Sequence, residues 1–136
     1  MGTTVKTRFE IASAVIKSEL KKPYEYGKSD CFFLGCQIAD AFEPSREMVK
    51  KYVGSYTTLL GAQRALKKRK FKSLSDLFGK HLDSCAPAAA QYGDIVILSL
   101  EGIEHVAICV GDLFLTRTEN GREFHPLNRV SAAFRT

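Results

Sequence analysis

The sequence lacks a long apolar run, a metal-binding motif and an internal repeat, and each absence excludes a class of protein. No stretch of the 136 residues is long and apolar enough to cross a bilayer, so we expect no membrane span. There is no Cys-x-x-Cys pair and no pair of histidines at ligand spacing, so no metal or other cofactor is expected. No low-complexity linker divides the chain, whose length suffices for one core but not for two. We therefore predict a single domain over residues 1–136.

The start of the sequence does not resemble a secretory signal, because polar residues lead directly into a helix-like segment. We therefore expect synthesis in a cytosol, where cysteines remain reduced thiols. The formal net charge is +5, and much of it lies in the basic run over residues 67–72. No known nucleic-acid-binding signature accompanies the run, so we interpret it as a solvated helix end and do not expect nucleic acid as a partner.

Hydrophobic spacing divides the chain into a helical half and a strand half. It predicts helices over about residues 7–22, 30–42 and 44–52, one that begins at Thr57 or Thr58, and a short one that begins at Ser73. Residues 30–42 are apolar nearly all round, which places that helix at the centre of the fold. After a connection of small residues at 85–90, strands are predicted over 94–100, 105–110, 113–116 and 123–127, and the tail at 130–134 adds a last strand or covers the core. Helices followed by antiparallel strands indicate an α+β fold.

Cys31 is the leading candidate for a catalytic residue. It follows a turn-rich stretch and opens the predicted central helix, with Asp30 near the N-cap. The positive end of the helix dipole is expected to lower the pKa of a thiol at this position and to favour the thiolate. Far along the chain, His105 stands at the start of a predicted strand. A thiol at a helix start and a histidine on a distant strand are the minimal components of a cysteine nucleophile and its base.

The other cysteines and histidines have simpler interpretations. Cys36 lies on a different helical face from Cys31, and Cys109 lies inside an apolar strand, so we expect both in the core. Cys85 falls in a predicted loop, where it is either exposed and reactive or inert. His81 and His125 stand in polar surroundings and are expected at the surface. Helical spacing places five further side chains in the core: Phe32, Phe33, Phe42, Leu59 and Leu66.

Four motifs, in this order, resemble the landmarks of the NlpC/P60 cysteine peptidase superfamily. They are Pro23-Tyr24-Glu25-Tyr26-Gly27, Ser29-Asp30-Cys31, Tyr92-Gly93-Asp94-Ile95-Val96 and His105-Val106-Ala107-Ile108-Cys109-Val110-Gly111. The short chain and its middle segment are more specifically similar to small NlpC/P60-related proteins of phage and prophage tail modules. The resemblance implies a papain-like fold, in which a central Cys-bearing helix packs on a small antiparallel sheet. It also implies cleavage of amide bonds in bacterial cell-wall peptides, other phage tail proteins as partners, and incorporation into a virion after synthesis in the host cytoplasm.

The resemblance also assigns roles to individual residues. Cys31 would be the nucleophile and His105 the general base that returns the proton to the leaving amine. Tyr24 and the backbone N–H of Cys31 would line the oxyanion site. Asp30 would cap the helix, and Gly93-Asp94 would shape the entry to the first core strand.

Two departures from the family pattern leave a second interpretation open. Phe32-Phe33 follow the cysteine where the family has small residues, and they either narrow the groove or simply pack. The polar residue that orients the base, usually a histidine in the family, would fall at Thr116 or Arg117, with Glu119 and His125 as stand-ins. Without an orienting residue the imidazole tautomer is not fixed. The alternative is therefore a catalytically impaired, structural tail-tip or tail-assembly subunit.

Overall fold

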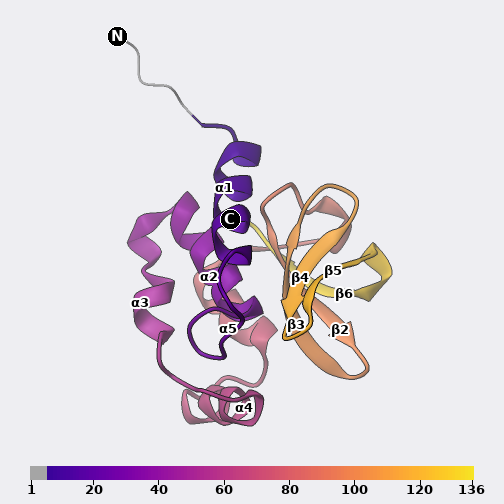
Figure 1. The fold of residues 1–136 in the computed structure, drawn as a ribbon. Helices are drawn as coiled ribbons and strands as arrows, with labels where there is room; N and C mark the ends of the chain where they lie inside the picture. The colour runs from indigo at the N-terminus through magenta and orange to yellow at the C-terminus, as the bar shows by residue number, and fades with distance from the viewer. Residues whose placement is uncertain (1–5) are drawn as a thin grey trace.

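The computed structural model describes residues 6–136 and has the α+β architecture that the sequence predicts. Helices come first along the chain and lie on one side of an antiparallel sheet formed by the later residues (Figure 1). The α-helices are α1 (Arg8–Leu20), α2 (Cys31–Phe42), α3 (Met48–Tyr52), α4 (Leu59–Lys68) and α5 (Leu74–His81). Single turns of 3-10 helix occur at Pro44–Arg46, Pro87–Ala89 and Leu127–Arg129. No helix within the described range has the length and apolar character needed to cross a bilayer.

The sheet has six strands in the order β1-β6-β2-β3-β4-β5, and every neighbouring pair is antiparallel. The strands are β1 (Ser84–Cys85), β2 (Ile95–Leu100), β3 (Ile103–Cys109), β4 (Phe114–Thr118), β5 (Gly121–His125) and β6 (Val130–Phe134). The predicted tail strand is confirmed as β6, which lies between β1 and β2. The expectation of a plain loop at residues 85–90 is wrong at its first residue, because Cys85 pairs with Ala133 at the sheet edge.

The helices begin where their capping residues predict. Four N-cap side chains each accept a hydrogen bond from the backbone N–H three residues later: Thr7, Asp30, Thr58 and Ser73. The predicted helix over residues 44–52 is interrupted, because Glu47 adopts a left-handed conformation with φ 48°. The carboxylate of Asp40 then accepts hydrogen bonds from the N–H groups of Met48 and Val49, at 2.9 and 3.0 Å, where α3 begins.

The α2 helix lies at the centre of the fold, as its apolar sequence predicts, and seven of its twelve residues are buried. Phe32 and Phe33 are buried as expected, and Phe42 and Leu66 are half-buried against the core. The core expectation for Leu59 is wrong, because 46% of its surface is exposed. It belongs to α4, which contains no buried residue and contacts the main core through Leu66.

A buried carboxylate anchors the entry to β2 and joins distant parts of the chain. Asp94 Oδ1 accepts hydrogen bonds from the Arg8 guanidinium and from the backbone N–H of Thr136, both at 2.9 Å. Its Oδ2 accepts from the N–H of Gln91 at 2.8 Å. The residue before it, Gly93, has φ 90°, a conformation that favours glycine. The Gly93-Asp94 pair therefore lies at the entry to the first core strand, as the sequence suggests.

Gly35 lies where α2 packs tightly against the sheet, and it gives a direct test of this packing. A Cβ atom at Gly35 would lie 2.8 Å from Val106 Cγ1 on β3. We predict that Gly35→Ala lowers the free energy of unfolding by roughly 1–3 kcal/mol because the core is overpacked. Gly79→Ala in α5 is the matched control, since its nearest contact would be an ordinary 3.7 Å. That variant should gain up to about 1 kcal/mol from helix propensity. Urea unfolding of both proteins measures the difference, and equal stabilities would contradict this packing.

Candidate active site

Cys31 is the first residue of α2 and lies in a cavity of about 290 Å³. Tyr24 and His105 line the same cavity, together with Asp30 and Tyr56. The Cys31 residue is half-buried. The predicted nucleophile and oxyanion tyrosine therefore lie at one cavity, whereas His105 borders it from β3 with its side chain on the other face of the sheet.

The carboxylate of Asp30 fixes the position of Cys31. Its Oδ1 caps α2 by accepting from the Phe33 N–H at 2.9 Å. Its Oδ2 accepts from the Gly27 N–H at 3.0 Å and from the Tyr56 hydroxyl at 2.5 Å. No side chain fits at Gly27, where a Cβ would lie 1.8 Å from the carbonyl oxygen of Tyr56. One buried group therefore joins the preceding turn, the helix start and the loop before α4.

Arg117 supports the same turn from the sheet. Its Nη1 donates to the carbonyl oxygen of Glu19 at 2.8 Å and to Ser29 Oγ at 2.9 Å. Its Nη2 donates to the carbonyl oxygen of Lys22 at 2.9 Å, and the guanidinium lies 5.3 Å from the centre of the Tyr24 ring. From the sequence, Arg117 is expected only as one of two positions for the residue that orients His105. In the structure Arg117 connects β4 to the end of α1 and to the segment before Cys31.

The pKa of the Cys31 thiol is raised to about 11, first because the group is desolvated and second because the Asp30 charge disfavours a thiolate. Polar contacts with the Val106 backbone, the Thr116 side chain and the Phe32 backbone act in the opposite direction. The predicted lowering of this pKa by the helix dipole is therefore wrong for this structure. Burial and a neighbouring carboxylate outweigh the dipole, and the group is a neutral thiol at pH 7.

His105 faces away from the helices. Along β3, Val106 and Ile108 pack in the cluster that contains α2, whereas Ala107 and Cys109 pack on the opposite face. Side chains alternate along a strand, so His105 lies on that second face. Its register partner on β2, Leu98, packs on the same face. No hydrogen bond joins it to Cys31 within residues 6–136. Burial lowers the pKa of His105, the charge of Glu123 opposes this shift and His125 adds to it, so the imidazole is neutral at pH 7.

The proposed orienting residues are all engaged elsewhere in the described chain. The Thr116 hydroxyl donates to the carbonyl oxygen of Val106 at 2.7 Å. Glu119 accepts from the Tyr26 hydroxyl at 2.6 Å, and His125 Nε2 lies 3.0 Å from a carboxylate oxygen of Glu123. Thr116 lies beside the thiol rather than beside the imidazole.

Tyr24, the expected oxyanion residue, lines the same cavity as Cys31. Burial, and then the neighbouring Cys31 and Asp30, raise the pKa of its hydroxyl well above the usual range. The hydroxyl is therefore protonated, and able to donate, at every pH of interest. Its ring packs edge-on against Tyr26, with the two ring centres 5.2 Å apart.

The other cysteines and histidines match the expectations only in part. Cys36 and Cys109 are buried, as predicted, and Cys85 is half-buried in β1. His81 and His125 are both half-buried and so only partly at the surface, and His81 Nε2 lies 2.6 Å from the Tyr52 hydroxyl. Within the described residues, no cluster of three or more histidine, cysteine or carboxylate side chains has the geometry of a metal site.

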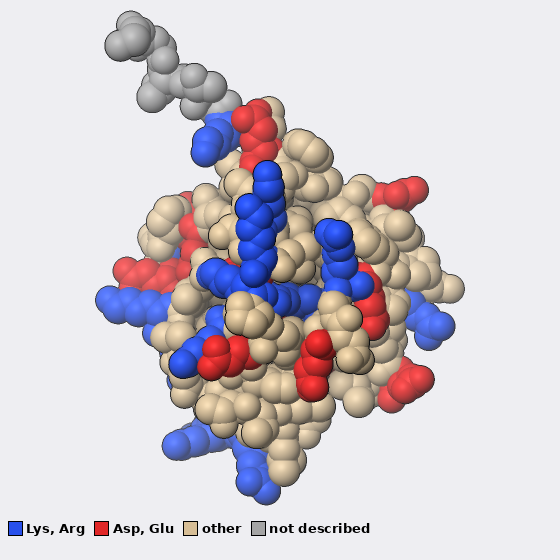
Figure 2. Space-filling view, in the orientation of Figure 1, with Lys and Arg blue, Asp and Glu red and all other residues tan. Residues whose placement is uncertain are grey.

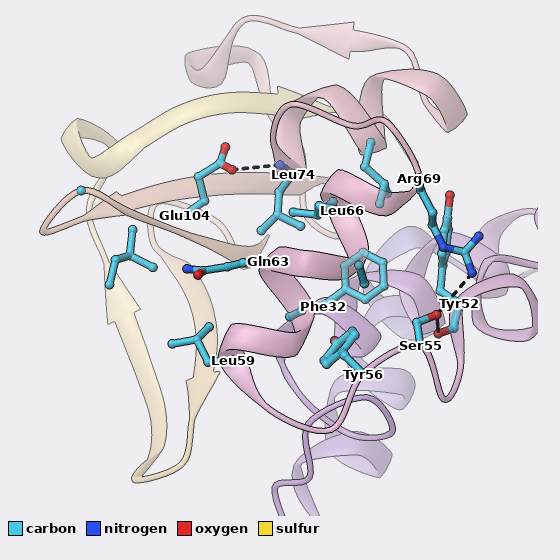
Figure 3. Close-up of a pocket in the computed structure, with 15 residues that line it drawn as sticks. Phe32, Tyr52, Ser55, Tyr56, Leu59, Gln63, Leu66, Arg69, Leu74 and Glu104 are labelled. Atoms are coloured by element: carbon cyan, nitrogen blue, oxygen red, sulfur yellow. Dashed lines mark hydrogen bonds between the residues drawn. The ribbon is translucent and has the colours of Figure 1, made fainter.

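An apolar pocket of about 260 Å³ adjoins the Cys31 cavity beneath α4 (Figure 3). Phe32, Leu66 and Leu74 point into it, and Glu104 lies at its edge, accepting a hydrogen bond from the Leu74 N–H at 2.9 Å. Five residues line both spaces: Tyr56, Leu59, Ala62, Leu74 and Glu104. The lining comes from segments far apart in the sequence, so no local pattern could reveal the pocket.

The family match covers nearly the whole chain. Residues 5–136 match the model of a domain of unknown function, DUF6950. The chain belongs to the DUF6950 family. No curated protein matches the sequence significantly. The Cys31 cavity of this DUF6950 protein lies entirely within the matched domain, and its relationship to the NlpC/P60 superfamily stays a prediction.

Asp30 should control the protonation of Cys31 in this DUF6950 domain. Asp30→Asn retains an oxygen to cap α2 but removes the negative charge, so the pKa of Cys31 should fall. We expect the alkylation rate of Cys31 at pH 8 to rise at least about threefold. Mass spectrometry that resolves the individual cysteines, over a pH series, measures this shift. Asp40→Asn is the control, because Asp40 caps α3 from the same helix and does not act on Cys31. Coincident pH profiles for all three proteins would contradict the assignment.

Proposed function

We propose that this protein is a thiol hydrolase of the NlpC/P60 type that cleaves amide bonds of bacterial cell-wall peptides as part of a phage tail. The observation that carries the proposal is the position of Cys31, at the N-terminus of the buried central helix and in a cavity that Tyr24 lines and that the start of β3, with His105, borders. The order of helices before an antiparallel sheet supports a papain-like arrangement. The four sequence motifs supply the expected substrate class.

In the proposed reaction, Cys31 Sγ attacks the carbonyl carbon of the amide and its proton passes to His105. The backbone N–H of Cys31 and the Tyr24 hydroxyl donate to the oxyanion that forms. His105 then protonates the leaving amine, and water hydrolyses the thioester to free the acid and restore the thiol. The neutral His105 and the protonated Tyr24 are in the states that these steps require.

The reaction requires the imidazole to reach the thiol when substrate binds. One feature of the sheet supports such a movement. Only two residues of β3 pair with β4: Ile108 pairs with Leu115, and Cys109 pairs with Phe114. The pairing therefore does not reach His105. Beyond it, the Thr116 hydroxyl bonds to the Val106 carbonyl in place of a backbone pair. The start of β3 is therefore less constrained on the β4 side than the rest of the strand.

The second candidate is a structural tail subunit that acts through protein contacts. Three observations favour it: the raised pKa of Cys31, the position of His105 on the opposite sheet face, and the engagement of Thr116, Glu119 and His125 with other groups. Under this alternative, the cavity is a remnant of an ancestral active site.

Hydrolysis of purified cell-wall peptide fragments, followed by mass spectrometry, separates the two candidates. Under the proposal, Cys31→Ala abolishes cleavage, and His105→Ala lowers the rate by about 10²–10⁴-fold because proton transfer is lost. The rate of the parent protein should also fall as acid protonates His105, whose lowered pKa moves this loss below its usual pH range.

His81→Gln is the matched control, since His81 contacts Tyr52 and lies outside the Cys31 cavity. It should retain the parent rate. If the parent protein cleaves no fragment, or if His105→Ala cleaves as fast as the parent, the hydrolase proposal is wrong and the structural candidate is favoured.

A further inference from the structure

A third space opens on the other side of the Cys31 cavity, between α1 and the β4–β5 hairpin. Its volume is about 660 Å³. Four residues line both this space and the Cys31 cavity: Tyr24, Arg117, Thr118 and Glu119. The Cys31 cavity therefore adjoins the apolar pocket at Tyr56 and this third space at Tyr24.

The third space is strongly cationic, and we call it the basic pocket. Its lining includes five basic side chains, Lys17, Lys21, Lys22, Arg117 and Arg122, and a single carboxylate, Glu119. Figure 2 shows basic side chains gathered near the middle of this face, over α1. The cations come from two elements that face each other, since Arg122 stands on β5. A favourable helix dipole explains lysines at the end of α1, but it does not explain this convergence.

Three of these charges are available to a ligand. Lys22 Nζ lies 2.8 Å from a carboxylate oxygen of Glu19, and Arg117 is bonded to carbonyl oxygens. Lys17, Lys21 and Arg122 have no ion-pair partner among residues 6–136. The Glu119 carboxylate accepts from the Tyr26 hydroxyl at the rim.

The apolar pocket on the opposite side has a contrasting character. Its two charged residues are already engaged: Glu104 accepts from the Leu74 N–H, and the Arg69 guanidinium lies 5.0 Å from the centre of the Tyr52 ring. Its remaining wall is mainly aliphatic and aromatic. The thiol thus lies between a space suited to an anion and a space suited to an apolar group.

We infer that the ligand of this cleft carries a carboxylate or similar anionic group on the Tyr24 side of Cys31 and an apolar group on the Tyr56 side. This inference rests on the proposed function, because it takes Cys31 as the reacting group. It narrows the substrate to an amide with these two groups on opposite sides of the scissile bond.

Three alkylating reagents with the same reactive carbon test the inference. They are the iodoacetamide of γ-aminobutyrate, which is anionic, the iodoacetamide of γ-aminobutyramide, which is neutral and polar, and N-pentyl iodoacetamide, which is apolar. Each forms a thioether with the thiolate and releases iodide. Rates are measured at about pH 9 and low ionic strength, where lysine charges persist and are weakly screened. Cys85, which is half-buried in β1 and lines neither pocket nor the cavity, is the internal reference.

Relative to Cys85, Cys31 should react with the anionic and the apolar reagents at least about fivefold faster than with the neutral polar one. Lys21→Gln combined with Arg122→Gln should remove the anionic preference and leave the apolar one. Leu66→Gln should do the reverse, because Leu66 lines only the apolar pocket. Lys50→Gln combined with Lys67→Gln removes the same charge elsewhere and should change neither preference.

The inference is overturned if the three reagents react alike at Cys31, if either preference survives its own variant, or if none of them modifies Cys31 in the folded protein. The proposed hydrolase can fail separately. If both preferences are present but no cell-wall fragment is cleaved, the cleft binds such a ligand without hydrolysing it.

Discussion

The buried carboxylate of Asp30 is the interaction on which the rest of the site depends. It caps α2, closes the turn at Gly27 and receives the Tyr56 hydroxyl, so three segments converge on it. Arg117 restrains the same turn through Ser29. The charge that builds this geometry also disfavours the thiolate beside it. The same carboxylate therefore builds the site and, after burial itself, contributes to the low reactivity of its resting thiol.

The arrangement around Cys31 combines features of an enzyme with features of a binding site. The helix start and the protonated Tyr24 can stabilise an oxyanion, while the neutral thiol and the remote imidazole are those of an inactive resting state. Catalytic hydrogen bonds often form only when substrate is present. The short β3–β4 pairing offers a physical route to that change. The cleft geometry, with its anionic and apolar preferences, is compatible with either role.

Local chemistry made the elements and the position of Cys31 at a helix start predictable from the sequence. Asp30 could be identified as a cap, and the apolar pattern of residues 30–42 placed α2 at the centre. The sequence did not predict which face of the sheet His105 occupies. The residues that follow it in β3, 106–109, are apolar and buried on both faces, so polar and apolar residues do not alternate there. The pKa of Cys31 depends on burial by distant segments, which the helix-start argument ignores. The two pockets form where α1 and α4 pack beside the sheet, and the hydrophobic spacing within each element does not predict how distant elements pack together.

The loose packing of α4 has a consequence for how the protein responds to a ligand. Its ten residues include none that is buried, yet five of them form part of the wall of the apolar pocket: Leu59, Ala62, Gln63, Ala65 and Leu66. A segment with so few buried contacts opens at a free energy well below that of global unfolding. The amide hydrogens of α4 should therefore exchange with solvent while the sheet and α2 stay closed. The pocket can thus adjust its width by local unfolding, and a ligand that fills it would slow the exchange of one helix without stiffening the whole molecule.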